Sequence, residues 1–338
     1  MSAGYHQGYQ QQRRPMPPQR ARRRRRPGRT ILVVLLVLLL AAVGFFFYVD
    51  STLKRIDALP DYEGRPAETP GTTWLLVGSD AREGLSQEQK DALATGDAAG
   101  RRTDTIMMLH LPDNSAAKPT LLSLPRDSYV PIPENGRNKI NAAFAFGGPQ
   151  LLVRTVEGAT GVRIDHYMEI GFGGFSDMVD AVGGVDICID EPIKDPLAGI
   201  DLPAGCQELD GPKALGFVRT RAFATADLQR VQNQRKFLSA LFEKVQSPAT
   251  LVNPFRVFPL MNAASGAVSV NNDDHVWHLA SVALNMGEAQ SGTIPIAGTP
   301  TIPGAGSVVQ WNKEKASQLF DLISKDQPVP ADLIAVPK

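Results

Sequence analysis

The sequence lacks the motifs that mark several large enzyme classes. Its 338 residues contain no Gly-x-Ser-x-Gly nucleophile turn, no P-loop, no Gly-x-Gly-x-x-Gly and no Cys-x-x-Cys. These absences argue against the corresponding hydrolases, nucleotide phosphatases, dinucleotide-binding enzymes and redox enzymes. The His275/His278 pair comes without a recognisable third ligand, so we expect it to serve in packing or at the surface. Because no covalent nucleophile is evident, the remaining residues favour direct, metal-assisted transfer.

Acidic residues are absent from the first 30 positions, although the whole chain has no net charge. Residues 1–30 hold nine of the 35 basic residues, and all nine are arginines. The remaining residues, 31–338, therefore contain 26 basic and 35 acidic residues, which gives them a net charge of −9. The two parts are therefore expected to lie in different environments. A Gln/Pro/Arg tail of this kind can bind nucleic acid, but beside a membrane span it is better explained as a disordered topology signal that touches anionic lipid. We expect no nucleic-acid partner.

Charge is also absent from the 19 residues of segment 31–49, which is rich in Leu and Val. As a helix this segment would span about 28 Å, close to the hydrocarbon core of a bilayer. Arginines before it and Asp50 after it predict a single-pass anchor, with the N-terminus in the cytoplasm and the rest outside the cell. A cleaved signal peptide is the alternative, but the apolar run continues through Phe45–Tyr48 and no small-x-small site follows.

Cysteine is scarce. Cys188 and Cys206 are the only two, and both fall in the predicted outer part. A bridge between them would close a loop of about 18 residues and add about 3 kcal/mol of stability. Two separate buried thiols are the alternative, but the predicted export favours a disulfide.

The rest of the chain predicts a layered α/β domain. Residues 50–70 contain repeated Pro and Gly and are expected to form a juxtamembrane linker, followed by a catalytic domain over 71–338. Apolar runs alternate there with helical patterns, which indicates α/β layering. The expected strands are Thr73–Val77, Thr105–Leu111, Thr120–Leu124, His166–Ile170 and Val185–Ile189. The expected helices are Gln87–Thr95, Pro149–Thr160, Phe172–Val182, Pro212–Val218 and Ala226–Val245, with more helix near 275–287 and 313–324.

Two carboxylates and an arginine are expected to converge at one sheet edge. The strands Thr105–Leu111 and Thr120–Leu124 are joined by a turn-rich link, which predicts a hairpin. A hairpin places Asp104 beside the Arg126-Asp127 step. If the strand Thr73–Val77 is also antiparallel to its neighbour, Asp80 reaches the same edge. A parallel arrangement would break this convergence.

Polar residues on the segment Ala226–Val245 face an unusual direction. Asp227, Arg230 and Gln234 share one helical face, and this face overlaps the apolar stripe instead of opposing it. Charges aimed at a core are costly unless they are paired or serve a site. An internal Asp227–Arg230 ion pair is the structural alternative.

The segment Arg219-Thr220-Arg221 lies in a short link between two expected helices. Next to an inward-facing arginine and a helix N-terminus, it predicts a polyphosphate clamp, because guanidinium groups match phosphate oxygens. Aspartates could hold a hard divalent cation, usually Mg²⁺ with Mn²⁺ as the alternative, that bridges the same phosphates.

The motifs resemble those of the LytR-CpsA-Psr family of cell-wall glycopolymer ligases, in its actinobacterial form. The matching segments are Leu75–Asp80, Arg102–Thr105, Ser123–Asp127, Lys139–Phe144, Asp180–Val185, Leu215–Arg221 and Asp227–Gln234. The resemblance implies a three-layer α-β-α sandwich with a central mixed sheet, preceded by one transmembrane helix. It also implies an apolar tunnel for the polyprenyl tail between sheet and helices.

The resemblance implies a role for each matched position. Asp80 and Asp104 would hold Mg²⁺, and catalysis would involve Arg126, Arg219, Arg221 and Asp227. The pyrophosphate would be bound by Arg102, Arg126, Arg219 and Arg221, with Arg230 and Gln234 in support and Lys139 as a weaker candidate. The implied reaction transfers a phosphoglycopolymer, such as arabinogalactan or a teichoic acid, from a polyprenyl-pyrophosphate carrier to a peptidoglycan hydroxyl. A pyrophosphatase side activity is also expected.

Three other functions fit parts of the sequence. An exported polyprenyl-diphosphate hydrolase would bind the same donor, with water as acceptor. A non-catalytic wall-binding or regulatory membrane protein would need neither Asp80 nor Asp104. A transcriptional regulator acting through the basic tail conflicts with the predicted export of most of the chain.

Overall fold

The computed structural model describes residues 27–80, 85–95, 103–220, 222, 226–247 and 254–334, with backbone only for residues 27–30, 226–231, 246, 254–259 and 264. The chain divides into two units, residues Met1–Phe45 and Phe46–Lys338. The described helices are α1 Pro27–Thr52, α2 Gln87–Ala92, α3 Ile140–Thr160, α4 Phe172–Ala181, α5 Gly211–Arg219, α6 Ala226–Gln246, α8 Pro254–Ala267, α9 Val276–Met286 and α10 Lys313–Ser324, with a 3₁₀ turn at Ala331–Leu333.

Helix α1 contains the expected membrane span. Its segment Ile31–Thr52 has a mean hydropathy of 3.0 and is the one described helix long and apolar enough to cross a bilayer. Residues Ile31–Leu40 expose their apolar side chains, as a lipid-facing helix would. Length and composition therefore fit a single-pass membrane protein.

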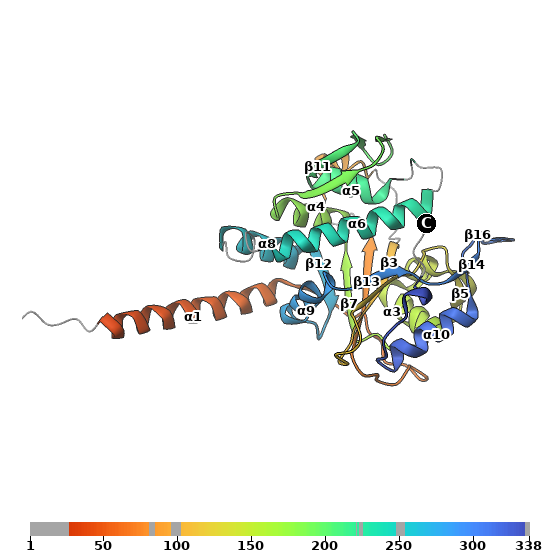
Figure 1. The fold of residues 1–338 in the computed structure, drawn as a ribbon, viewed down its shortest axis with the longest axis horizontal. Helices are drawn as coiled ribbons and strands as arrows, with labels where there is room; N and C mark the ends of the chain where they lie inside the picture. The colour runs from red at the N-terminus through yellow and green to blue at the C-terminus, as the bar shows by residue number, and fades with distance from the viewer. Residues whose placement is uncertain are drawn as a thin grey trace, which may run out of the picture. The chain divides into compact units, whose positions relative to one another are not determined.

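A mixed seven-stranded sheet forms the centre of the second unit (Figure 1). Its strands, in spatial order, are β1 Lys54–Ile56, β12 Val268–Asn271, β7 His166–Ile170, β2 Thr72–Ser79, β3 Thr103–Leu111, β4 Thr120–Ser123 and β13 Gln290–Thr293. Strand β3 is antiparallel to both β2 and β4, whereas β2 is parallel to β7. The predicted mixed sheet and the β3–β4 hairpin are confirmed.

Both faces of this sheet are buried, which explains its long apolar runs. On β2, Leu75 and Val77 pack in the core that contains residues of α3 and α10, whereas Trp74 and Leu76 pack with residues of α6 and α9. Alternate side chains of a strand point to opposite faces, so one strand serves both cores. The predicted three-layer α-β-α sandwich is confirmed.

A smaller β-rich region packs against α4, α5 and α6. It contains β8 Val185–Ile189 paired with β11 Gly205–Leu209, and β9 Ile193–Asp195 paired with β10 Ile200–Leu202. Cys188 and Cys206 lie opposite each other in the β8–β11 ladder and form a disulfide. Further short pairs are β5 Tyr129–Ile132 with β6 Gly136–Lys139, β14 Ile296–Gly298 with β17 Gln310–Trp311, and β15 Thr301–Ile302 with β16 Gly306–Ser307.

Two helix boundaries differ from the prediction by three or more residues. Helix α3 starts at Ile140 instead of Pro149, because the chain forms helix on both sides of a break at Gly147 and Gly148. Gly148 has a φ of 63°, and Pro149 then restarts the helix at a position where its missing N–H costs nothing. Helix α2 ends at Ala92 instead of Thr95, where Ala94 takes a positive φ of 47°.

Residues 50–70, expected to be a linker, are instead packed into the domain. Strand β1 adds an edge to the central sheet by pairing in parallel with β12. Further on, Tyr62 and Arg65 both bond to the buried carboxylate of Glu157 on α3. Three strand residues are too few to give a periodic pattern, which is why the sequence did not predict this strand.

Candidate active site

The end of β2 and the adjoining ends of β3 and β4 bring the predicted charged residues to one sheet edge. Ser79 is paired with Thr103, so Asp80 and Asp104 follow two residues that lie opposite each other. Arg126 comes just after β4, and its Nη1 donates to Oδ1 of Asp104 over 2.5 Å. The antiparallel order of the three strands therefore places Asp104 beside Arg126, as the hairpin argument predicted, and Asp80 follows the end of β2 at the same sheet edge.

A local irregularity helps to place Asp104. The β2–β3 register shifts between Gly78 and Ser79, and the Thr103 hydroxyl donates to the Gly78 and Thr105 carbonyls at 3.0 and 2.9 Å. A Cβ at position 78 would lie only 3.0 Å from Cβ of Thr105, so this approach favours glycine. Such a bulge bends the strand locally and changes the direction in which its side chains point.

Arg126 belongs to a chain of alternating charges. Its Nε donates to Oδ2 of Asp127 at 3.3 Å, and the ammonium group of Lys139 lies 2.8 Å from Oδ1 of the same carboxylate. The side chain of Asp104 keeps 37% of its surface exposed, against 18% for Arg126. The arginine is thus fixed between two carboxylates while the site stays accessible to a charged ligand.

Arg219 is held at the end of α5 by three contacts. Its Nη1 and Nη2 donate to the carbonyls of Leu93 and Ala94, just after α2, at 3.0 and 3.3 Å. Its guanidinium carbon lies 4.6 Å from the ring centre of Phe172. Cation–π stacking and carbonyl contacts orient the guanidinium group.

The next residue, Thr220, is fixed by a carboxylate that the sequence did not single out. The Thr220 hydroxyl donates to Oδ2 of Asp195 at 2.8 Å, and Oδ1 accepts the N–H groups of Leu197 and Ala198 at 3.1 Å. Thr220 is fully buried. Asp195 therefore anchors the Arg-x-Arg segment, and no local pattern could have paired it with a residue 25 positions away.

Gln234, one of the three residues of the polar face predicted on α6, points inward. Its side chain is 7% exposed, and its Nε2 donates to the Val218 carbonyl at 3.3 Å. The bond joins α6 to the end of α5, next to Arg219. Four other predicted site residues fall outside the described side chains: Arg102, Arg221, Asp227 and Arg230.

A cavity of about 340 Å³ adjoins these residues, between the sheet and helices α4, α5, α6 and α9. Most of its wall is apolar, including Leu76, Met107, Met168, Phe175, Phe237 and Leu238. Charged and amide groups contribute at a few positions, namely Asp104, Asp195, Arg219 and Gln234. The cavity therefore combines an apolar lining with groups suited to a polar head.

Ser79 adds an oxygen without a partner. It lines the cavity at 1% exposure, and its hydroxyl has no hydrogen-bond partner in the described structure. Buried hydroxyls nearly always have partners, so this oxygen is available to a ligand or to a metal-bound water. Carboxylate and hydroxyl oxygens, such as those of Asp80, Asp104 and Ser79, are the type of ligand that Mg²⁺ prefers.

Helix α5, which carries Arg219, is capped by a carboxylate whose ionisation we expect to matter for stability. Asp210 accepts the Lys213 N–H at 3.0 Å. Burial opposes its ionisation, but the Lys213 hydrogen bonds and charge outweigh burial and lower the pKa of Asp210. Because the pKa of Asp210 is lower in the folded chain than in the unfolded chain, its ionised form stabilises the fold at pH values above the unfolded-state pKa. This stabilisation is lost as the pH falls through the folded-state pKa.

We therefore expect Asp210→Ala to lower the free energy of unfolding by about 1 kcal/mol at pH 7. The difference from wild type should shrink below about pH 4. Thermal unfolding across this range measures it, with Asp201→Ala as control, because the Asp201–Lys194 pair is exposed on both sides. A difference that stays constant into acid would contradict the linkage.

Comparison with known proteins identifies the family. The LytR_cpsA_psr family matches residues 53–323. The chain is 55% identical over 275 residues to the probable cell wall biosynthesis protein LcpB of Corynebacterium glutamicum, covering 81% of this chain and 65% of the relative. It is 36% identical over 183 residues to the polyisoprenyl-teichoic acid–peptidoglycan teichoic acid transferase TagT of Bacillus subtilis, covering 52% of this chain and 53% of that protein.

The fold comparison agrees. A LytR-Csp2A-Psr enzyme from Actinomyces oris superposes with a TM-score of 0.63 at 21% identity, covering 80% of this chain and 96% of that structure. The chain spans less than two thirds of the length of the curated relatives named above. On the extent of the family match and the identity to LcpB, this chain belongs to the LytR_cpsA_psr family.

Proposed function

We propose that this chain is a Mg²⁺-dependent phosphotransferase that moves a glycopolymer from a polyprenyl-pyrophosphate carrier to a hydroxyl of peptidoglycan. The observation that carries the proposal is the composition of the cavity wall. An apolar lining meets Asp104 and Arg219, and Arg126 is paired to Asp104 beside it. A polyprenyl pyrophosphate has the matching chemistry, with a long apolar tail and a doubly charged head. The teichoic acid transferase activity in the name of TagT supports the same class of reaction.

The arginines would bind and neutralise the diphosphate. Arg126 and Arg219 are oriented by carboxylate, carbonyl and aromatic contacts, so they need little reorganisation when the ligand enters. Asp195 would position the Arg-x-Arg segment through Thr220. Asp80 and Asp104, with the Ser79 hydroxyl nearby, would hold Mg²⁺. When bound, this ion would supply positive charge to the diphosphate oxygens.

In the proposed reaction, an acceptor hydroxyl oxygen forms a bond to the phosphorus that carries the polymer. The bond from this phosphorus to the bridging oxygen breaks, and polyprenyl phosphate leaves with that oxygen. Arg126 and Arg219 would stabilise the negative charge that develops on the leaving group. The apolar lining would keep the tail in place and exclude water from the donor.

The proposed location is the cell envelope, with the N-terminal tail in the cytoplasm and the domain outside. The arginine-rich start before the apolar segment of α1 supports this orientation. The Cys188–Cys206 disulfide fits an oxidising compartment. A membrane anchor would also keep the domain close to a donor whose tail is dissolved in lipid.

Release of polyprenyl phosphate from a polyprenyl-pyrophosphate sugar tests the proposal. The assay should use the full chain in detergent, because residues 54–65 contribute a strand and an ion pair to the domain. We expect release with Mg²⁺, none with EDTA, and transfer of the sugar to added peptidoglycan. Release without transfer would favour the diphosphate hydrolase, and no release at all would favour a non-catalytic wall-binding protein.

A further inference from the structure

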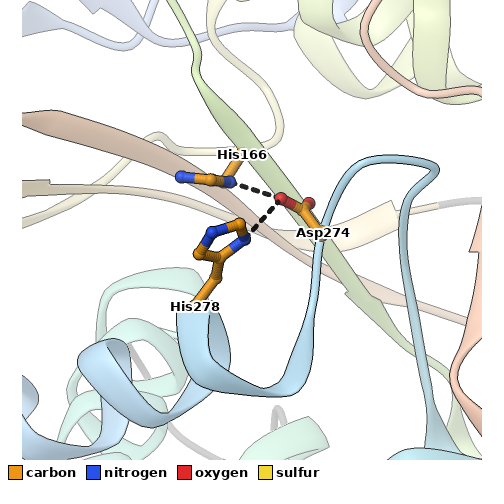
Figure 2. A group of neighbouring side chains, drawn as sticks. All are labelled: His166, Asp274 and His278. Atoms are coloured by element: carbon orange, nitrogen blue, oxygen red, sulfur yellow. Dashed lines mark hydrogen bonds and ion pairs between the residues drawn. The ribbon is translucent and has the colours of Figure 1, made fainter. Parts of the chain in front are cut away.

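Three side chains with metal-binding groups meet at a place that the proposed reaction does not use. His166 is the first residue of β7, Asp274 lies between β12 and α9, and His278 is in the first turn of α9 (Figure 2). One ligand-type atom from each lies within 4.8 Å of the other two. None of the three lines the cavity, and no other group of this kind occurs among the described residues.

The carboxylate of Asp274 is the centre of the cluster. Its Oδ1 contacts Nδ1 of both histidines, as a short hydrogen bond to His166 and at 3.7 Å from His278 (Figure 2). Its Oδ2 accepts hydrogen bonds from the backbone N–H groups of Tyr167 and Asn271, at 3.2 and 3.1 Å. The carboxylate is therefore fixed with one oxygen directed between two imidazoles, as second-shell hydrogen bonds fix metal ligands.

The charge balance of the cluster favours a cation. Asp274 is 1% exposed, and among the described residues no lysine or arginine pairs with it. A buried carboxylate is costly unless a positive charge accompanies it. The imidazoles supply that charge only when they are protonated, whereas a metal ion would supply it while they stay neutral.

Aromatic neighbours hold the imidazoles in place. The His166 ring stacks on Trp74 with centres 4.4 Å apart, and it lies 4.6 Å from the ring of His278. The Trp277 ring packs edge-on against His278 at 5.7 Å. The side chains of His166 and His278 keep 19% and 30% of their surface exposed, so an ion can reach them from solvent.

We propose that His166, Asp274 and His278 form a binding site for a divalent transition metal ion, of which Zn²⁺ fits best. Two imidazole nitrogens and one carboxylate oxygen are a common Zn²⁺ ligand set, with solvent in the fourth position. Tetrahedral ligands about 2.0–2.1 Å from the ion lie roughly 3.3 Å apart, close to the His278–Asp274 separation. The ion would take the place of the proton between His166 and Asp274, and those two atoms would have to move apart to the separation of two ligands. It would also replace the hydrogen bond that Nδ1 of His278 accepts from the His275 N–H at 3.3 Å.

The position of the cluster indicates what the ion would do. His166 belongs to β7, whose Met168 and Ile170 line the cavity, and His278 belongs to α9, whose Met286 lines it as well. A bound ion would join β7 directly to α9 and so fix two walls of the cavity. This role is structural, and it holds whether or not the proposed transfer reaction is correct.

Metal titration of the full chain in detergent tests the proposal, with the protein stripped of metal and purified through a tag without histidine. Co²⁺ is a visible probe for Zn²⁺ sites. We expect one Co²⁺ per chain, with absorption typical of tetrahedral coordination, displaced by Zn²⁺ and not by excess Mg²⁺. His166→Gln and His278→Gln should each weaken Co²⁺ binding at least tenfold.

His275→Gln is the matched control. This neighbouring histidine faces Asp50 at 3.0 Å instead of Asp274, so its loss should leave Co²⁺ affinity unchanged. Quenching of tryptophan fluorescence by Co²⁺ is a second readout in the wild-type chain, because Trp74 and Trp277 flank the cluster. Absence of stoichiometric binding, unchanged binding in both glutamine variants, or binding without quenching would each overturn the proposal.

Discussion

Replacing Arg126 with alanine is expected to reduce Mg²⁺-dependent release of polyprenyl phosphate by about 10²–10³-fold. Arg126 donates hydrogen bonds to two carboxylates, those of Asp104 and Asp127. Its removal would take away charge stabilisation for the leaving phosphate and would also leave Asp104 without this ion pair. The rate of release under saturating donor measures the effect.

Two further variants separate the role of Arg126 from simple loss of structure. Arg126→Lys keeps the charge but loses the planar fork that spans two oxygens, so we expect an intermediate rate. Arg137→Ala is the matched control, because this arginine stacks on Tyr129 and bonds to its carbonyl outside the site. A rate within threefold of wild type for Arg126→Ala would remove Arg126 from the proposed mechanism.

The sheet edge could be predicted because its residues are placed by local connectivity. Residues 112–119 link β3 to β4 as an antiparallel hairpin, so the position of Asp104 relative to Arg126 follows from the strand order alone. Apolar runs also marked the central strands, since both faces of the sheet are buried. These patterns thus predicted a layered α/β domain and the position of Asp104 beside Arg126, and the family resemblance implied the three-layer sandwich.

Contacts between distant segments could not be predicted in the same way. The sequence paired His278 with His275, whereas the folded chain brings His278 beside Asp274 and beside His166, which lies 108 residues before Asp274. Asp195 and its partner Thr220 likewise lie on separate elements. No periodicity or spacing encodes such pairs. They depend on how β7, α9 and α5 pack, which only the folded chain specifies.

The packed segment after α1 leads to the largest expected effect on stability. The carboxylate of Glu157 on α3 is fully buried and accepts hydrogen bonds from Arg65 at 3.1 Å, from the Tyr62 hydroxyl at 2.7 Å and from the Ile164 N–H at 3.0 Å. Burial and the adjacent carboxylate raise the pKa of Tyr62 well above its ordinary value, so its hydroxyl stays protonated and donates. Three groups from two parts of the chain thus depend on one side chain.

We expect Glu157→Ala to lower the free energy of unfolding by about 3–5 kcal/mol, because it leaves the guanidinium of Arg65 buried without its partner. Glu134→Ala is the matched control, since the Glu134 side chain is 79% exposed and pairs with Arg154 only at 3.5 Å. An exposed pair of this kind contributes about 0–1 kcal/mol. Thermal unfolding of the two variants beside wild type measures the difference, and equal losses would contradict the prediction.

A double substitution shows whether the loss arises from the ion pair itself. Arg65→Ala alone should also destabilise, because it leaves a carboxylate without a counter-charge in the core. If the pair is the cause, Glu157→Ala combined with Arg65→Ala should cost less than the sum of the two single losses. The remaining loss would report the Tyr62 and Ile164 contacts. Additive losses would mean that each residue stabilises the fold independently, and that residues 50–70 are held to α3 mainly by packing.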